Sequence, residues 1–110
     1  MDWKIREGFF KDMMPVDFPL TVGQDFSGQV IGLGKNTHFY QKGDMVYGFA
    51  PGAYAEFVCV NEATIAKIPE DVDYITAAAI PTAGLTAYQL IMNAIDLKAG
   101  QTLLLHGAGG

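Results

Sequence analysis

Three glycines near the carboxyl end of the sequence indicate phosphate chemistry. Gly107, Gly109 and Gly110 follow the short apolar run of residues 102–105. A loop with so few side chains lets the backbone approach a pyrophosphate, and a helix after such a loop presents its positive end to the phosphates. Since a complete G-x-G-x-x-G motif needs residues after Gly110, we expect a fragment that ends within a nucleotide-binding loop. In such a fragment the glycines are equally compatible with a frayed chain end.

Two threonines are placed where they could bind a ribose or a carboxamide. Thr82 and Thr86 lie at the junction between two predicted helices. Hydroxyl groups and unpaired N–H groups at a helix start can bind such polar ligand groups. A threonine near a helix start is also a common cap, so a purely structural role stays open for both residues.

The residue types that bind metals are few and scattered in this sequence. Cys59 is the only cysteine, so no internal disulfide and no cysteine-based zinc site can form within the chain, and we expect a buried, inert thiol. His38 and His106 have no ligand-spaced neighbour, and we expect ordinary surface or hydrogen-bonded histidines. The sequence therefore predicts no metal site.

The composition is that of a folded protein without a polyanionic partner. Half of the 110 residues are hydrophobic and 17% are charged, which is typical of a globular domain. The formal net charge of −5, with only seven Lys plus Arg, argues against nucleic acids and acidic membranes as partners. The longest apolar stretch is interrupted by Pro81 and Gly84, and no signal-peptide pattern opens the chain, so we expect a cytoplasmic protein.

Short β-strands separated by glycine turns are expected between residues 18 and 68. The clearest candidates are residues 29–31, 45–47 and 55–60, and Gly43 belongs to a turn before the second of them. A small barrel or sandwich is the expected architecture, because closure removes the edges of the sheet.

Two helices and a buried strand are expected in the last third of the chain. Asp73 can cap a first helix over residues 74–79, which Pro81 is expected to end. Apolar residues at helical spacing predict a second helix from about residue 85 to residue 95. The apolar run of residues 102–105 is predicted to form a parallel strand that is covered on both faces.

Five stretches together resemble the medium-chain dehydrogenase/reductase superfamily. Residues 23–30 (GQDFSGQV) and 43–48 (GDMVYG) resemble the opening barrel motifs of that family. Residues 77–88 (AAAIPTAGLTAY) resemble the stretch that joins its GroES-like barrel to its Rossmann domain. Residues 103–110 (LLLHGAGG) resemble the first Rossmann strand and the start of the pyrophosphate loop. Residues 2–8 (DWKIREG) are similar to the start seen in zinc-independent quinone and enone reductases, the zeta-crystallin-like branch.

The resemblance implies a mainly β fold in two parts. Residues 1–73 would form a GroES-like catalytic domain, a partly open barrel with short helices that binds the substrate. Residues 74–110 would form linker helices and the first helix and strand of a truncated Rossmann nucleotide-binding domain.

The resemblance also implies chemistry without zinc. Zinc-dependent relatives carry a histidine where this chain has Gln24, and a neutral glutamine is a poor zinc ligand. Asp25 alone cannot hold the metal. A zinc-type alcohol dehydrogenase is therefore the least favoured interpretation.

Without a metal, the carbonyl oxygen of a substrate must be polarised by hydrogen-bond donors or by a cation. The resemblance implies that Lys4 is this catalytic group, because enone reductases have a lysine in the matching segment near nicotinamide and substrate. Several quinone reductases have a tyrosine there, so a solvated surface lysine is the alternative. Asp2 would orient Lys4 or the cofactor, or would be a plain surface acid. The implied cofactor-binding residues are Asp2, Thr82, Thr86, Gly107, Gly109 and Gly110.

The complete protein would then reduce quinones, enones or related carbonyl electrophiles by hydride transfer from NADPH. NADPH is implied by this branch of the family, because the residue that separates NADPH from NADH would follow Gly110. The complete protein would form a homodimer or a homotetramer, and the fragment alone would be inactive. A non-catalytic binding or structural module of the same fold is the alternative, since a fold alone does not establish a reaction.

Overall fold

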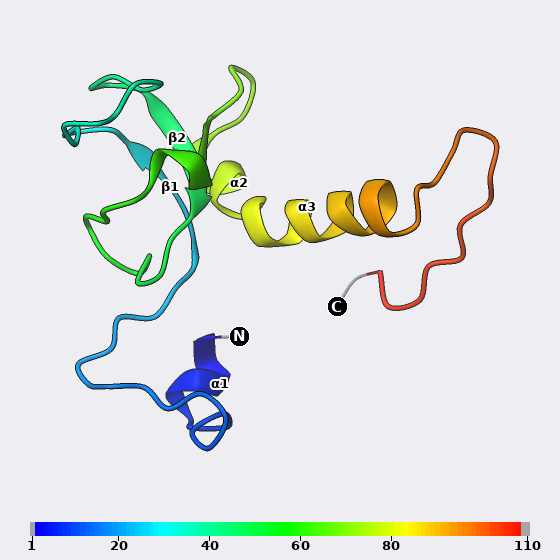
Figure 1. The fold of residues 1–110 in the computed structure, drawn as a ribbon, viewed down its shortest axis with the longest axis horizontal. Coiled ribbons are helices and arrows are strands. Elements are labelled where there is room, and N and C mark those ends of the chain that lie inside the picture. The colour runs from blue at the N-terminus through cyan, green and yellow to red at the C-terminus, as the bar shows by residue number, and fades with distance from the viewer. Residues whose placement is uncertain (1, 109–110) are drawn as a thin grey trace.

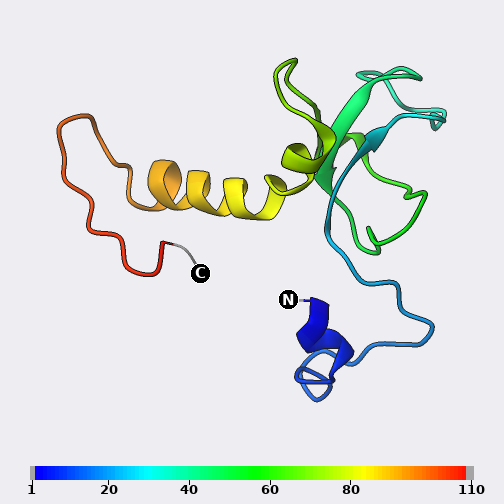
Figure 2. The same ribbon diagram turned by 180° about the vertical axis from the view of Figure 1, so that it is seen from behind.

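The computed structural model describes residues 2–108 (Figure 1). The elements are, in chain order, α1 (Asp2–Arg6), β1 (Asp25–Gln29), β2 (Met45–Phe49), the 3-10 turn η1 (Glu62–Thr64), β3 (Ile65–Lys67), α2 (Tyr74–Ala78), α3 (Pro81–Tyr88) and the π-helix η2 (Gln89–Ala94). A long loop joins α1 to the sheet, and α3 and η2 lead away from the sheet (Figures 1 and 2). The radius of gyration of 16.8 Å exceeds the roughly 13 Å of a compact domain of about 100 residues. The chain is therefore less compact than a typical domain of its length.

The sheet is antiparallel with the order β1-β2-β3, and β2 lies in the middle. Phe26 pairs with Gly48 across β1 and β2, and Gly48 pairs with Ile65 across β2 and β3. Within β2, Val46 and Gly48 are buried while their neighbours are more exposed, which is the alternation expected of a strand with one covered face. The predicted strand at residues 45–47 is confirmed.

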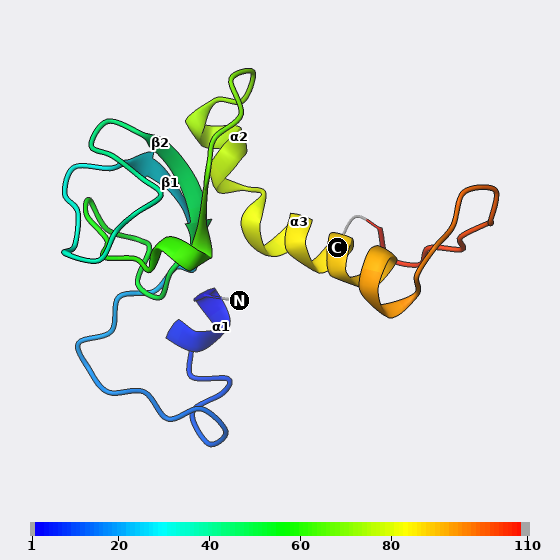
Figure 3. The same ribbon diagram turned by 45° about the horizontal axis from the view of Figure 1, so that its top comes forward.

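The core lies where α2 covers the sheet. Val46, Ala50, Ile68 and Ala77 are its buried apolar residues. Figure 3 shows α2 beside the strands. Few large apolar side chains are covered in the described part of the chain, and surfaces of this kind mark contacts with further protein or with ligands. No helix in this part has the length and apolarity that crossing a membrane requires.

The sheet is not closed, and this agrees with the predicted partly open barrel. β1 and β3 are its two edges. Two strand predictions were wrong in detail. The strand predicted at residues 29–31 begins at Asp25 and ends at Gln29, although Val30 still exchanges backbone hydrogen bonds with the Gly43–Asp44 turn. Residues 55–60 form no strand, since no neighbouring strand in the described chain pairs with them.

The first predicted helix is confirmed, and the second begins earlier than predicted. The carboxylate of Asp73 accepts a hydrogen bond of 2.7 Å from the Thr76 N–H and caps α2. Pro81 does not only follow α2; it is the first residue of α3, where its fixed φ and missing N–H cost nothing. The helix expected over residues 85–95 therefore corresponds to the second half of α3 followed by η2.

Two predictions of burial in apolar segments were also wrong. Residues 102–105 are exposed and form no strand in this structure, because no partner strand in the described chain lies beside them. Cys59 is exposed, since the segment that carries it stands outside the sheet.

Close approach of two segments requires glycine at position 23. Gly23 is buried and has φ of +98°, and an added Cβ would lie 2.6 Å from the backbone nitrogen of Tyr54. Its carbonyl accepts hydrogen bonds from the N–H groups of Gly52 (3.0 Å) and Ala53 (3.1 Å). No side chain fits this position without moving the backbone.

We expect Gly23→Ala to lower the free energy of unfolding by about 2 kcal/mol or more, because it combines a strained φ with a clash against backbone. Gly28→Ala is the matched control within β1, since an added Cβ there meets nothing within 4 Å. The control should change the free energy by about 0.5 kcal/mol or less. Urea unfolding of the three proteins measures both values, and equal stability of the two variants would contradict this account.

We expect acid to destabilise the fold through Asp44 and Asp73. The Gln41 N–H and the Lys67 ammonium hold the pKa of Asp44 below its ordinary value of 3.8. The N–H and hydroxyl of Thr76 do the same for the pKa of Asp73. A carboxyl with a lowered pKa in the folded state stabilises the fold above its unfolded pKa, and this contribution is lost as the pH falls through the folded value.

The urea concentration at the midpoint of unfolding should therefore decrease as the pH falls below about 4, the ordinary pKa of an aspartate. The midpoint of the Asp73→Asn variant should decrease less steeply with pH, because asparagine can still cap α2 but does not titrate. Identical pH profiles for the two proteins would show that Asp73 does not contribute.

Candidate functional site

The start of β1 is bonded to the start of α3 across 57 residues of sequence. The carboxylate of Asp25 accepts a hydrogen bond of 2.5 Å from the Thr82 hydroxyl and one of 3.2 Å from the Thr82 N–H. Ile80, which precedes α3, makes no side-chain cap bond of its own. Asp25 therefore supplies the missing cap of α3 from a distant strand, and its negative charge lies at the positive end of the helix.

Thr86 lies one turn further along α3 and is hydrogen-bonded to Thr82. Its hydroxyl donates a hydrogen bond of 2.6 Å to the carbonyl of Thr82. Thr82 and Thr86 are both exposed. Both threonines therefore make the capping and backbone contacts expected for a structural role. Both side chains also remain accessible to a ligand.

The loop before β1 is bonded to α1. The carboxylate of Asp2 accepts a hydrogen bond of 3.2 Å from the Gly23 N–H and one of 3.5 Å from the Tyr54 hydroxyl. Since Gly23 and Asp25 are separated by one residue, Asp2 and Thr82 are both attached to the same short segment of chain. The structure thus brings these two predicted site residues to one end of β1.

A pocket of about 370 Å³ lies between α1 and the loop before β1. It is lined by Asp2, Trp3, Arg6, Val22 and Tyr54. An acid, a guanidinium and two aromatic rings can together hold a flat polar ligand.

Lys4 lies on α1 but is not among the residues that line this pocket. Its ammonium is 5.6 Å from the centre of the Trp3 ring, a cation–π distance, and the Trp3 and Phe9 rings meet edge to face. The side chain is exposed. Its catalytic role stays a prediction.

The predicted phosphate loop is not joined to the threonines by a described contact. Gly107 has φ of +71°, and an added Cβ there would meet nothing within 4 Å. Its backbone is therefore open to a ligand. Gly109 and Gly110 lie outside the described residues.

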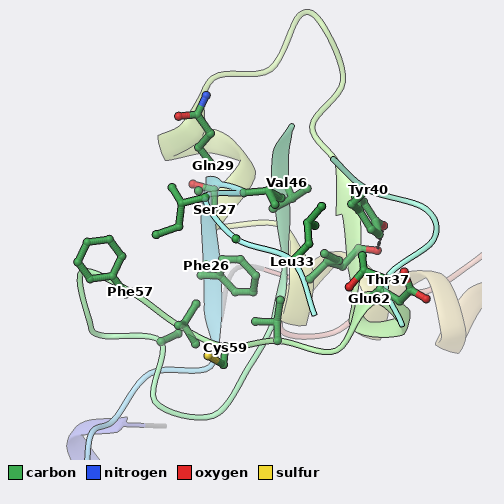
Figure 4. A pocket seen from close by; sticks show the side chains of 18 of the residues that line it. Phe26, Ser27, Gln29, Leu33, Thr37, Tyr40, Val46, Phe57, Cys59 and Glu62 are labelled. Atoms are coloured by element: carbon green, nitrogen blue, oxygen red, sulfur yellow. Dashed lines mark hydrogen bonds between the residues drawn. The ribbon is translucent and has the colours of Figure 1, made fainter. Parts of the chain in front are cut away.

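A larger pocket of about 740 Å³ lies beside β1 on the open sheet (Figure 4). Phe26 and Val46 of the sheet line it together with Phe57 and Cys59 of the unpaired segment. The Glu62 carboxylate at its margin is already occupied by the backbone N–H groups of His38 and Phe39. None of the predicted site residues lines this pocket. Its mostly apolar lining could contact a ligand but has few groups that could take part in a reaction.

Residues 2–108 contain no set of side chains that could bind a metal ion. Across residues 2–108 no group of three His, Cys, Asp or Glu side chains lies close enough together to hold an ion. Gln24, between Gly23 and Asp25, is half-buried.

Sequence reasoning missed Asp25 and Tyr54 as parts of this site. Asp25 had been considered only as an insufficient metal ligand. A signal for its capping role existed, because Ile80 is not a capping residue type and the helix that starts at Pro81 needs an acceptor from elsewhere. No signal in the sequence pointed to Tyr54, whose contact with Asp2 depends on the fold.

Comparison with known proteins gives one family and several long relatives. Residues 1–70 match the model of the alcohol dehydrogenase GroES-like domain. Human quinone oxidoreductase is 36% identical over 94 residues, which cover 84% of this chain and 29% of that protein. Among solved structures, human synaptic vesicle membrane protein VAT-1 homolog-like protein is 35% identical with a TM-score of 0.81, over 88% of this chain and 31% of that one. Quinone oxidoreductase from Coxiella burnetii is 38% identical with a TM-score of 0.72, over 90% and 33%. The chain spans about a third of the length of these relatives.

We expect Asp2→Ala to loosen α1 from the rest of the molecule. The loss of its hydrogen bonds from the Gly23 N–H and the Tyr54 hydroxyl, which contribute about 1 kcal/mol in all, should raise the population of detached helix about fivefold. Trp3 is the only tryptophan, so quenching of its fluorescence by acrylamide should increase. Asp12→Ala, at an exposed position in the following loop, is the control and should leave the quenching unchanged. Equal quenching in all three proteins would show that Asp2 does not hold α1.

Proposed function

We propose an oxidoreductase role for this chain, which belongs to the alcohol dehydrogenase GroES-like domain family. The observation that carries the proposal is the juxtaposition at the start of β1. There, α1 and α3 are bonded to Gly23 and Asp25 of one short segment. A substrate-side segment and a cofactor-side segment must meet in this way if hydride is to pass between their ligands. Similarity to quinone oxidoreductases on both sides of the junction supports the same role.

We propose that the two parts of the chain have different roles. Residues 1–73 form the substrate domain, and residues 74–110 begin the nucleotide-binding domain. The match of the family model to residues 1–70 supports a boundary at this place.

A nicotinamide dinucleotide, NADPH, is the proposed cofactor, and it supplies the hydride. The described residues offer it fitting groups. Thr82 and Thr86 present exposed hydroxyl oxygens, and Gly107 presents open backbone. Asp2 shapes the site by holding α1 against Gly23. Gly109 and Gly110 belong to the same proposal as further backbone contacts to the pyrophosphate.

Lys4 is the proposed group that polarises the substrate carbonyl, since an ammonium stabilises negative charge that develops on oxygen. Its cation–π contact with Trp3 orients the side chain without occupying its N–H donors. We propose that the reaction needs no zinc, because Gln24 stands where zinc-dependent relatives carry a histidine and a neutral glutamine is a poor zinc ligand.

Quinones, enones and related carbonyl compounds are the proposed substrates, and similarity to proteins named quinone oxidoreductase supports the quinones. A homodimer or homotetramer in the cytoplasm is proposed for the complete protein. The name of one relative refers to a synaptic vesicle membrane.

The first test is titration of NADPH into this chain and into the complete gene product, side by side, by calorimetry. Binding by the complete protein, together with NADPH oxidation when a quinone is added, is the expected result. A chelator should leave that rate unchanged. Binding by neither protein would contradict the proposal and favour a non-catalytic module of the same fold.

The second test is Lys4→Met in the complete protein. If Lys4 polarises the carbonyl, kcat should fall about 100-fold while the Kd for NADPH stays the same, because one charge-stabilising donor is lost. Lys11→Met, a lysine in the exposed loop after α1, is the control. An unchanged kcat would return Lys4 to the role of a surface residue.

A further inference from the structure

We infer that the hydroxyls of Thr82 and Thr86 both act as hydrogen-bond acceptors only, Thr82 because Asp25 is a positioning residue that takes its proton and Thr86 because it donates to the Thr82 carbonyl, so that this end of α3 selects a ligand group that donates. The amino group of a carboxamide is such a group. The inference rests on the proposed function, since it concerns how a nicotinamide would be recognised at this site.

The hydrogen bond between Thr82 and Asp25 can run in one direction only. An ionised carboxylate can only accept hydrogen bonds. The contact of 2.5 Å between the Thr82 hydroxyl and Asp25 therefore uses the single hydroxyl proton of Thr82. This length is typical of a strong charge-assisted bond. The second contact, from the Thr82 N–H, holds the carboxylate in place at 3.2 Å.

The hydrogen bond of the Thr86 hydroxyl also runs in one direction only. A backbone carbonyl also only accepts, so the Thr86 hydroxyl proton is used in its bond of 2.6 Å to the carbonyl of Thr82. A threonine that bonds to the carbonyl one turn earlier is common in helices, but the bond from Thr82 to a strand is not local. Both hydroxyl oxygens are left with lone pairs and no proton to offer.

The lone pairs of the two hydroxyl oxygens are accessible, and they lie near the negative charge of Asp25. Thr82 and Thr86 are exposed and Asp25 is half-buried. Among residues 2–108 no cation contacts the carboxylate of Asp25, which accepts its hydrogen bonds from Thr82. A carbonyl, carboxylate or phosphate placed against the two hydroxyls would meet lone pairs and a nearby negative charge. A primary amide, which carries two N–H donors, meets none of these penalties.

The test uses the complete protein and two dinucleotides: NADPH and its analogue in which a methyl ketone replaces the carboxamide. The ketone keeps the carbonyl but has no N–H to donate. Calorimetry should give a Kd for the analogue about tenfold higher than for NADPH, because a donor is lost opposite two acceptors. Circular dichroism checks that each variant is folded.

Asp25→Asn is the decisive variant. Its amide oxygen can still accept from the Thr82 N–H and its amino group can donate to the Thr82 hydroxyl, which frees the hydroxyl proton for a ligand. The tenfold preference for the carboxamide should then shrink to about twofold. Thr86→Val should also reduce the preference for the carboxamide. Thr86→Ser, which keeps the hydroxyl, should retain that preference. These two variants keep the test independent of any folding defect at Asp25.

Equal affinity of the unaltered protein for the two dinucleotides would overturn the inference while leaving the proposed function standing. An unchanged preference in both Asp25→Asn and Thr86→Val would also overturn it, since other residues would then select the carboxamide. Failure of NADPH to bind to the complete protein would overturn the proposed function and this inference together.

Discussion

The absence of a Cβ at position 23 is the constraint on which the rest of the structure depends. Gly23 adopts φ of +98° and lies so close to Tyr54 that any side chain would collide with its backbone. Its carbonyl binds the turn that contains Gly52, and its N–H binds Asp2. One residue thus fixes the loop after β2, the position of α1 and the direction in which the chain enters β1.

The candidate site follows from this geometry. Because the chain enters β1 at a fixed angle, Asp25 faces the first turn of α3 and completes a helix start that lacks its own cap. A packing constraint on the backbone therefore determines the hydrogen bonding of the Thr82 hydroxyl. The same short segment attaches α1, so groups that are distant in sequence share one end of the strand. This is how a small open sheet can align two chemically different segments without a large core.

Local chemistry could be read from the sequence, while long-range pairing could not. The Asp73 cap, the strand at residues 45–47 and the β-rich character of the middle segment followed from turn residues and capping preferences. Residues 55–60 and 102–105 have strand-like composition, yet a strand forms only where a neighbour supplies hydrogen bonds. Thr82 was identified as a polar group at a helix start, but its partner Asp25 lies 57 residues away, and no periodicity links the two.

The long reach of the bond between Asp25 and Thr82 has a consequence for chain entropy. Closing a 57-residue loop costs about 1 kcal/mol more than closing the 21-residue loop between Asp2 and Gly23. Once β1, β2 and β3 have paired, Lys67 is already held near β1, and the loop still to be closed runs only from Lys67 to Thr82. Assembly of the sheet therefore lowers the entropic barrier to forming the site, and the order in which the strands follow one another along the chain favours that sequence of events.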